Sequence, residues 1–303
     1  GTGNAYTLDV SDGANVDAAD LLALNGKTTV AVDLQLITAA GTALNGNYAE
    51  LKALFAAAAS GDYTGLAGNL PITIDDNVNV SQANEISALT SAAVTANISD
   101  TVLANYAGLE GTGNAYTIAI ADAAIDADAL QALNAKTTVN IDLTGDTSIS
   151  GTLANVNAVV AETGVTNVLN TIAVTITDTI TAAQAETLVG TNVGNVTATI
   201  AAGTAAGISG ALTGAADGND NFSITVTDSS VDPALLNTLD SRTATDIDVS
   251  AVNTISGANA AIVTLYGNTA NFVGLGNENI TASDASITVA QAVALLGFTS
   301  GSL

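Results

Sequence analysis

The 303-residue chain contains no cysteine, no histidine, no tryptophan and no methionine. Without cysteine it can form neither disulfides nor thiolate metal sites. Without histidine it lacks the usual general base and the usual zinc ligand, which removes Ser-His-Asp and Cys-His chemistry and most transition-metal sites. We therefore expect a protein that is not an enzyme.

Positive charge and aromatic side chains are also scarce. Four bases stand against 29 acids, which gives a formal charge of -25, and aromatic residues make up 3% of the chain. We do not expect nucleic-acid binding, because four bases are too few to neutralise the phosphates. Binding to anionic membrane surfaces is disfavoured for the same reason. No apolar run is long enough to span a bilayer, so we expect no membrane insertion.

What the chain does contain is a repeat. The stretch Asp126–Leu143 occurs earlier as Asp17–Leu34 and later as Asp232–Val249, at offsets of 109 and 106 residues. A second stretch, GTGNAYTL at 1–8, returns as GTGNAYTI at 111–118 and as GNDNFSI at 218–224. Three copies at one period indicate a repeat architecture, with units at 1–110, 111–217 and an incomplete 218–303 in one continuous structure.

Each copy of the first stretch predicts a short helix followed by a strand. An aspartate at the N-cap (Asp17, Asp126 or Asp232) precedes leucines spaced three apart, and alternating apolar and polar residues follow. Further helices are predicted by capping boxes that begin at Asn79, Thr181 and Thr288.

The same alternation predicts eleven strands, which lie near 7–10, 30–34, 72–74, 94–98, 117–120, 139–143, 173–176, 196–200, 223–226, 246–249 and 279–282. Insertions run at about 35–70, 145–170 and 250–277, the first with an Ala-rich helix over 48–59. One strand and one helix per ~20–29 residues is the format of a leucine-rich-repeat-like solenoid. We expect an elongated α/β solenoid of about eleven coils, with a parallel sheet on one face and short helices on the other.

Aspartates recur where strands end. They are Asp12, Asp76, Asp100, Asp122, Asp178, Asp228 and Asp284. In stacked coils, neighbouring carboxylates ~5 Å apart repel one another unless something neutralises them. One interpretation is local turn chemistry, in which each Asp bonds its own backbone. The alternative is a calcium edge, since carboxylate and carbonyl oxygens suit that ion, although no EF-hand loop or calcium nonapeptide occurs.

The outward strand face is rich in threonine and asparagine. It comprises Thr73, Thr95, Asn97, Thr175, Thr177, Thr197, Thr199, Thr225, Thr227 and Thr281. Threonine favours strands and forms ladders, so packing alone explains the pattern. A regular array could instead bind ice or glycan, but acidic second-coil strands interrupt it, for example at Asp33 and Asp142.

Three of the four bases, Lys27, Lys136 and Arg242, occupy equivalent positions. A helix C-terminus that favours positive charge explains them, and pairing with Asp33, Asp142 and Asp248 is the alternative. Acid pairs such as Asp75 and Asp76 could in principle act on a glycosidic bond. In a chain this acidic such pairs arise freely, and no aromatic platform accompanies them.

The stretches GTGNAYTI, ITAAQAETL and DIDVSAVNTISG resemble giant repetitive secreted surface proteins of cyanobacteria and marine bacteria. This resemblance implies an extracellular, acidic, calcium-tolerant structural or adhesive rod. We therefore predict a filament, surface layer or adhesin stalk at the cell surface, with calcium as the candidate ion. The expected partners are copies of the chain or neighbouring repeats of a longer one, and the alternative is a glycan- or ice-binding module.

Overall fold

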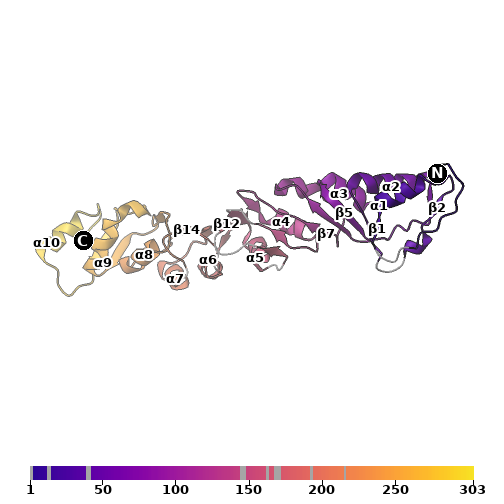
Figure 1. Ribbon diagram of the computed structural model, residues 1–303. Helices are drawn as coiled ribbons and strands as arrows, with labels where there is room; N and C mark the ends of the chain where they lie inside the picture. Colours follow the sequence, from indigo (N-terminus) through magenta and orange to yellow (C-terminus); the bar gives the residue numbers. More distant parts are fainter. Residues whose placement is uncertain are drawn as a thin grey trace. The chain divides into compact units, whose positions relative to one another are not determined.

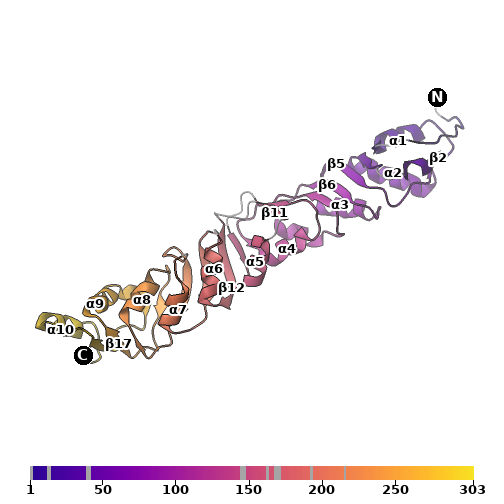
Figure 2. The same ribbon diagram turned by 90° about the horizontal axis from the view of Figure 1, so that it is seen from below.

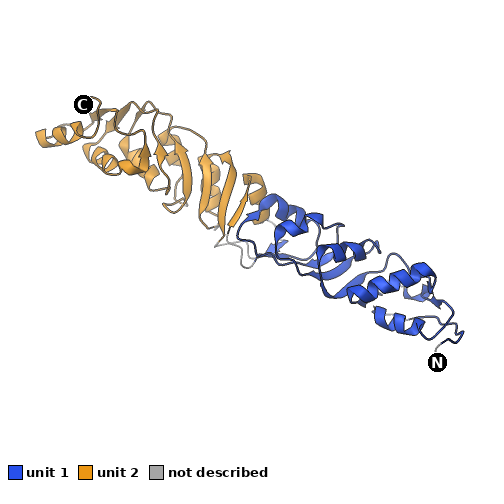
Figure 3. Cartoon of the chain, turned by 90° about the horizontal axis from the view of Figure 1, so that it is seen from above, with its two compact units in different colours: residues 1–146, 161–167 blue, residues 147–160, 168–303 orange. Residues whose placement is uncertain are grey.

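The computed structural model describes residues 3–11, 15–38, 42–143, 148–161, 164–166, 172–191, 194–214 and 216–303. These residues form a mixed α/β protein with parallel sheets and no closed barrel. They divide into two compact units, residues 1–146 with 161–167 and residues 147–160 with 168–303 (Figure 3). The division falls within the predicted repeat 111–217, and each unit is described by itself.

Unit 1 is built on a five-stranded parallel sheet in the order β1-β3-β5-β6-β7. Helices α1, α2 and α3 lie on one side of it (Figure 1). Unit 1 also contains two parallel pairs, β2 with β4 and β9 with β11, and the short strand β8. The strands are β1 Val16–Asp17, β2 Val32–Asp33, β3 Leu44–Gly46, β4 Tyr63–Thr64, β5 Ile72–Val78, β6 Val94–Ile98, β7 Ala115–Thr117, β8 Ile125–Asp126, β9 Ile141–Asp142 and β11 Val165–Thr166. The helices are α1 Ala18–Asn25, η1 Gln35–Thr38, α2 Tyr48–Ser60, α3 Val80–Ser87, η2 Leu103–Gly108 and α4 Ala127–Asn134.

Unit 2 repeats the same design. Its larger sheet runs β10-β12-β13-β14-β16-β18 and its smaller sheet runs β15-β17-β19, all in parallel. Helices α6 to α9 follow one another along these strands (Figure 2). The strands are β10 Ser148–Gly151, β12 Ala173–Ile180, β13 Val196–Ile200, β14 Asn221–Thr225, β15 Ser230–Val231, β16 Ile247–Asp248, β17 Thr254–Gly257, β18 Phe272–Val273 and β19 Asn279–Ala282. The helices are α5 Leu153–Ala161, α6 Ala182–Val189, α7 Ala205–Ala211, α8 Pro233–Asp240, α9 Asn259–Gly267, η3 Thr269–Asn271 and α10 Val289–Leu296.

The helix starts follow the local sequence signals. Asp17, Asp126 and Asp232 cap α1, α4 and α8, and Pro233 occupies the first turn of α8. Capping boxes begin α3, α6 and α10 as predicted, and a further box at Asn47 and Glu50 begins α2. These predictions are confirmed because a cap is a bond between residues two or three apart, which the local sequence specifies.

The insertions differ from the prediction, which gave them no strands. Strands β3, β10 and β17 lie in them, and each pairs within a parallel sheet. These strands are three or four residues long and end in glycine, so they carry too little alternation to be read from the sequence. The predicted strand at 7–10 is reduced to an isolated bridge between Asp9 and Asp33.

A threonine hydroxyl joins two successive strand–helix segments, which we call coils, at the same place in all three copies. Thr137 Oγ1 accepts a hydrogen bond from the Tyr116 N–H at 3.0 Å and donates to the Tyr116 carbonyl at 2.7 Å. Thr243 forms the same two bonds with Phe222 at 2.8 and 2.9 Å, and Thr28 forms them with Tyr6 at 3.1 and 2.7 Å. A hydroxyl can donate and accept at once, so one side chain satisfies both backbone groups.

We call this pair of bonds the threonine bracket, and its removal from the buried copy should destabilise unit 2. Thr243→Val keeps the side-chain shape but leaves the N–H of Phe222, whose residue is fully buried, without its acceptor. We expect a loss of about 1–3 kcal/mol in the free energy of unfolding, measured by urea denaturation.

Thr227→Val is the matched control, because Thr227 is exposed and its hydroxyl makes no hydrogen bond to the residues that the structure describes. Equal losses in the two variants would contradict the bracket.

Candidate functional site

Five of the predicted calcium-edge aspartates bind the start of a helix in the preceding coil. Each carboxylate accepts a hydrogen bond from the backbone N–H of the first helical residue, 19 to 28 positions earlier in the chain. The pairs are Asp76 with Tyr48 at 2.8 Å, Asp122 with Leu103 at 2.7 Å, Asp178 with Leu153 at 2.8 Å, Asp228 with Ala205 at 2.6 Å and Asp284 with Asn259 at 2.6 Å.

This bond is an N-cap supplied by the next coil. The first N–H groups of a helix have no partner within it, and the helix dipole favours negative charge at that end. Two of the helices depend on the bond most, because the N-cap residues Val102 of η2 and Ala258 of α9 make no side-chain cap of their own. The carboxylates of Asp122 and Asp284 serve there instead. We call the five residues the cross-coil caps.

The other two predicted residues differ. Asp100 Oδ1 accepts from the Asn105 side chain at 3.2 Å, and its carbonyl accepts from the Tyr106 hydroxyl at 2.5 Å, so it holds the local turn before η2. Asp12 lies outside the residues that the structure describes. The turn interpretation therefore fits Asp100, whereas the cross-coil caps form bonds that neither the turn nor the calcium interpretation contained. Among the described residues no three acidic side chains group around a common point.

The recurring bases do not share one role. Arg242 donates to the carbonyls of Ala216 at 3.0 Å and Thr213 at 3.3 Å, beyond the end of α7, the helix of the preceding coil. From the other side, the Glu186 carboxylate accepts from the backbone N–H groups of Gly214 and Ala216 at 2.8 and 3.2 Å. The loop is held between two coils. Neither Lys27 nor Lys136 forms an ion pair with an acidic residue that the structure describes.

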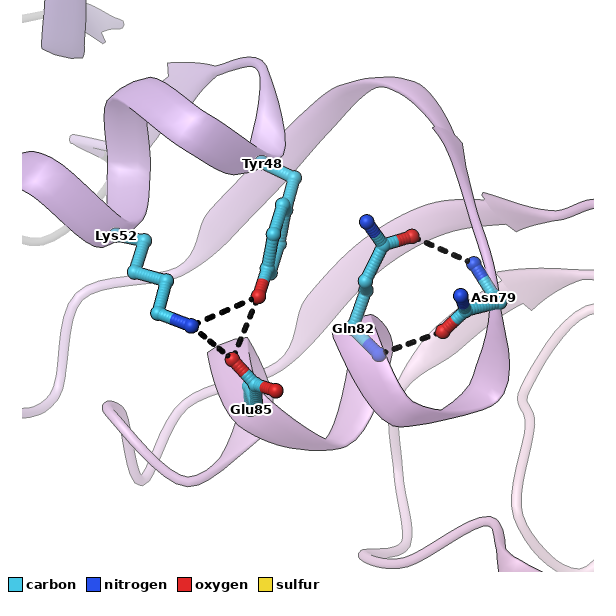
Figure 4. A network of polar contacts seen from close by, with 5 residues as sticks. All are labelled: Tyr48, Lys52, Asn79, Gln82 and Glu85. Carbon is cyan, nitrogen blue, oxygen red and sulfur yellow. Dashed lines mark hydrogen bonds and ion pairs between the residues drawn. The ribbon is translucent and has the colours of Figure 1, made fainter.

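A polar cluster that the sequence analysis missed lies between α2 and α3 (Figure 4). Glu85 accepts from Lys52 Nζ at 2.6 Å and from the Tyr48 hydroxyl at 2.6 Å. The hydrogen bond with Glu85 raises the pKa of Lys52, and the bond from Lys52 lowers the pKa of Glu85. Both groups are well exposed to solvent, which limits the stability they supply. The sequence gave no signal for this cluster, because Glu85 lies 33 residues from Lys52 and 37 residues from Tyr48.

Beside this cluster is a shallow apolar groove lined by Lys52, Phe55, Ala56, Ala59, Ile86 and Leu89. Its only ionisable groups are already paired with one another, Lys52 with Glu85. The groove is thus an apolar seam between α2 and α3 whose two charged groups are paired with each other.

Asp220 and Glu278 are the two buried acids among the described residues, and Asp220 is the one that lies in the repeated stretch at 218–224. It corresponds to Asn114 in the earlier copy, and both side chains accept the N–H of the first residue of the preceding strand: Val196 to Asp220 at 2.8 Å, Val94 to Asn114 at 2.9 Å. Burial raises the pKa of Asp220, although the Val196 and Asp217 N–H groups act in the opposite sense. A neutral amide thus fills in unit 1 the position that a carboxylate fills in unit 2.

No family model, curated protein or solved structure matches the chain. Among the described residues, no helix has the length and apolar character needed to cross a membrane.

Removal of a cross-coil cap should cost most where the helix has no cap of its own. Asp284→Ala leaves the start of α9 uncapped, so we expect a loss of about 1–2 kcal/mol in the free energy of unfolding by urea denaturation. Asp228→Ala should cost less, because Thr204 still accepts the Gly207 N–H of α7 at 3.1 Å.

Asp246→Ala is the charge-matched control, since Asp246 is exposed and makes no hydrogen bond to a described residue. If all three variants change stability equally, net charge rather than capping is the cause.

The raised pKa of Asp220 predicts a pH dependence with a definite sign. The folded protein holds the Asp220 proton more tightly than the unfolded chain, so stability from this group is lost as pH rises from the ordinary value of 3.8 through the raised one. Asp220→Asn cannot ionise. We expect the free energy of unfolding of the variant, relative to that of the parent, to increase with pH across this window.

Urea denaturation at closely spaced pH values between about 4 and 7 measures that difference. Asp246→Asn provides the exposed control. A pH-independent difference for Asp220→Asn would contradict the buried-acid interpretation.

Proposed function

We propose that the chain is an extracellular structural repeat protein, a component of a filament, surface layer or adhesin stalk, built as a solenoid of about eleven strand–helix coils. The observation that carries this proposal is the recurrence of the same bonds between successive coils. Threonine brackets at Thr28, Thr137 and Thr243 and the cross-coil caps join each coil to its neighbour.

These bonds suit a load-bearing scaffold. Each coil contributes a few buried aliphatic side chains, and backbone groups that it leaves unpaired form hydrogen bonds with side chains of the next coil. Stability therefore accumulates along the repeat through contacts between nearest neighbours. In two of the three brackets the aromatic residue, Tyr116 or Phe222, is fully buried. A structure in which many polar side chains join one coil to the next supports a structural role.

The cell-surface location rests on the resemblance of GTGNAYTI and ITAAQAETL to repetitive secreted surface proteins. The formal charge of -25 is compatible with such a setting, where salt and divalent ions weaken the mutual repulsion of acidic surfaces. Calcium is the proposed ion, because a capping carboxylate that accepts one N–H through one oxygen keeps its second oxygen as a potential ligand. The proposed sites are the seven aspartates of the predicted edge.

The test is assembly and melting as a function of calcium. We expect chelator or low salt to lower both the melting temperature and the sedimentation coefficient, and millimolar Ca²⁺ to restore them. Sodium chloride at matched ionic strength separates screening from specific binding. Negative-stain micrographs of the same samples should show end or flank contacts between copies.

If melting and sedimentation are flat from chelator to excess calcium, the calcium part of the proposal is wrong. If the protein also stays monomeric in every condition, the proposal that copies assemble is wrong as well.

The second candidate is a glycan- or ice-binding module that uses the outward strand face. The observation that favours it is the register of threonine side chains on adjacent parallel strands: Thr175 lies beside Thr197, and the half-buried Thr73 lies beside the exposed Thr95. Such pairs repeat at about 4.8 Å, the strand spacing. In unit 1 the row continues as Asn77 and Asn97, whose side chains bond each other at 2.7 Å. A monomer that is depleted from solution by a glycan array, or that reshapes ice crystals, would favour this candidate over the first.

A further inference from the structure

Residues 4–7 of unit 1 form an extended segment joined to Thr28 by an isolated bridge at Asn4, and one edge of this segment is not covered by any described strand, unlike that of its two counterparts, β7 and β14. Its aromatic residue, Tyr6, is 51% exposed, whereas the equivalent Tyr116 and Phe222 are fully buried. The three segments share their sequence pattern and their threonine bracket. The difference in burial therefore comes from what lies against the other edge of the strand.

In both counterparts a strand–helix coil covers that edge. Strand β6 pairs with β7 through Thr95–Ala115, Ala96–Tyr116 and Asn97–Thr117, and β13 pairs with β14 in the same register. The side chains of Asn114 and Asp220 accept the N–H of the first residue of the covering strand, Val94 or Val196. The covering coils are residues 94–109 and 196–212, which we call fourth coils.

Residues 4–7 already hold the conformation that such a coil requires. The Thr28 hydroxyl accepts the Tyr6 N–H and donates to the Tyr6 carbonyl, so Tyr6 points its backbone groups toward the Thr28 side. Because alternate residues of a strand turn their backbone groups to opposite sides, Ala5 and Thr7 face the open edge. Neither donates a backbone hydrogen bond to a residue that the structure describes. Asn4 stands where Asn114 stands.

The helix beside this edge is open as well. The last leucine of the repeat, Leu133 in α4 and Leu239 in α8, is 3% and 0% exposed, and these helices pack against η2 and α7 of the fourth coils. Its counterpart Leu24 in α1 is only half-buried. The edge of residues 4–7 and the flank of α1 are thus both without the fourth coil that covers their counterparts among the described residues.

We propose that the edge formed by residues 4–7 and the adjacent flank of α1 is a docking surface for a fourth coil, a strand–helix segment with the pattern of 94–109. The segment adds a parallel strand in the β6–β7 register and gives the N–H of its first strand residue to the Asn4 side chain. This inference deepens the proposed structural role by naming the partner of one surface.

Charge supports the same occupant. Residues 94–109 contain one charged side chain, Asp100, and residues 196–212 contain none, in a chain with a formal charge of -25. A neutral segment approaches an acidic surface without the repulsion that the rest of the chain would meet. A strand that adds to a sheet edge satisfies the exposed N–H and C=O groups by backbone bonds alone.

The experiment fuses residues 70–110, the third and fourth coils of unit 1, directly before Gly1, so that Glu110 precedes Gly1 as it precedes Gly111. Fusion supplies the segment at high effective concentration. We expect hydrogen exchange at the amides of Ala5 and Thr7 to slow by at least about tenfold, since a paired amide exchanges only on local opening. Nitration of Tyr6 by tetranitromethane should also decrease.

Two controls make the outcome decisive. A fusion with the same residues in scrambled order should protect neither amide. Ala5→Pro removes the donor that faces the edge, so it should abolish the protection of Thr7 in the fused protein, while in the parent chain it removes no hydrogen bond to a described residue.

Unchanged exchange and nitration in the fusion, or equal protection from the scrambled segment, would overturn the proposal. So would concentration-dependent protection of Tyr6 in the parent chain, because a second copy would then be the occupant. None of these readouts depends on calcium or on filament formation, so this inference and the proposed function can fail separately.

Discussion

The interaction on which the structure most depends is the hydrogen bond that satisfies a backbone group of one coil with a side chain of the next. Helices eight or nine residues long leave a large share of their N–H groups without intrahelical partners. A strand edge leaves its own groups open in the same way. The cross-coil caps bind N–H groups at helix starts, and the threonine brackets bind N–H and C=O groups at strand edges. The backbone hydrogen bonds of a coil are therefore satisfied only when the neighbouring coil is present.

This dependence explains the composition. Aspartate and threonine are small acceptors and donors that reach a neighbouring backbone without a long, flexible side chain, so little conformational entropy is lost when they are ordered. Layers of valine, isoleucine, leucine and alanine fill the space between sheet and helix without aromatic bulk. The acidic excess follows in part from capping, because carboxylates at helix N-termini are stabilising while exposed ones add repulsion. Function is therefore best sought at surfaces where the succession of coils is interrupted.

The repeat also shows how one position tolerates different chemistry. Asn114 and Asp220 accept the same N–H, yet one is neutral and the other has a raised pKa because of its burial. Asn84 and Glu186 hold equivalent loops after the next helix: the amide oxygen of Asn84 accepts from the Glu110 N–H, and the carboxylate of Glu186 accepts from the Gly214 N–H. In each pair the geometry is kept and the charge varies, since the bond to the backbone requires only an acceptor oxygen.

The sequence by itself determined the repeat, the α/β class and the helix starts, because caps and leucine spacing act over a few residues, as at Asp17, Pro233 and Thr288. It could not place β3, β10 and β17, which are too short to show a period and gain their hydrogen bonds from strands 24 to 28 residues distant. Only the tertiary structure decided what the edge aspartates bind. Asp284 meets the N–H of Asn259 because two coils stack, and no local pattern around either residue encodes that contact. Tyr116 and Tyr6 have the same neighbours in sequence, yet Tyr116 is buried because β6 packs beside its strand, whereas none of the described strands covers that side of Tyr6.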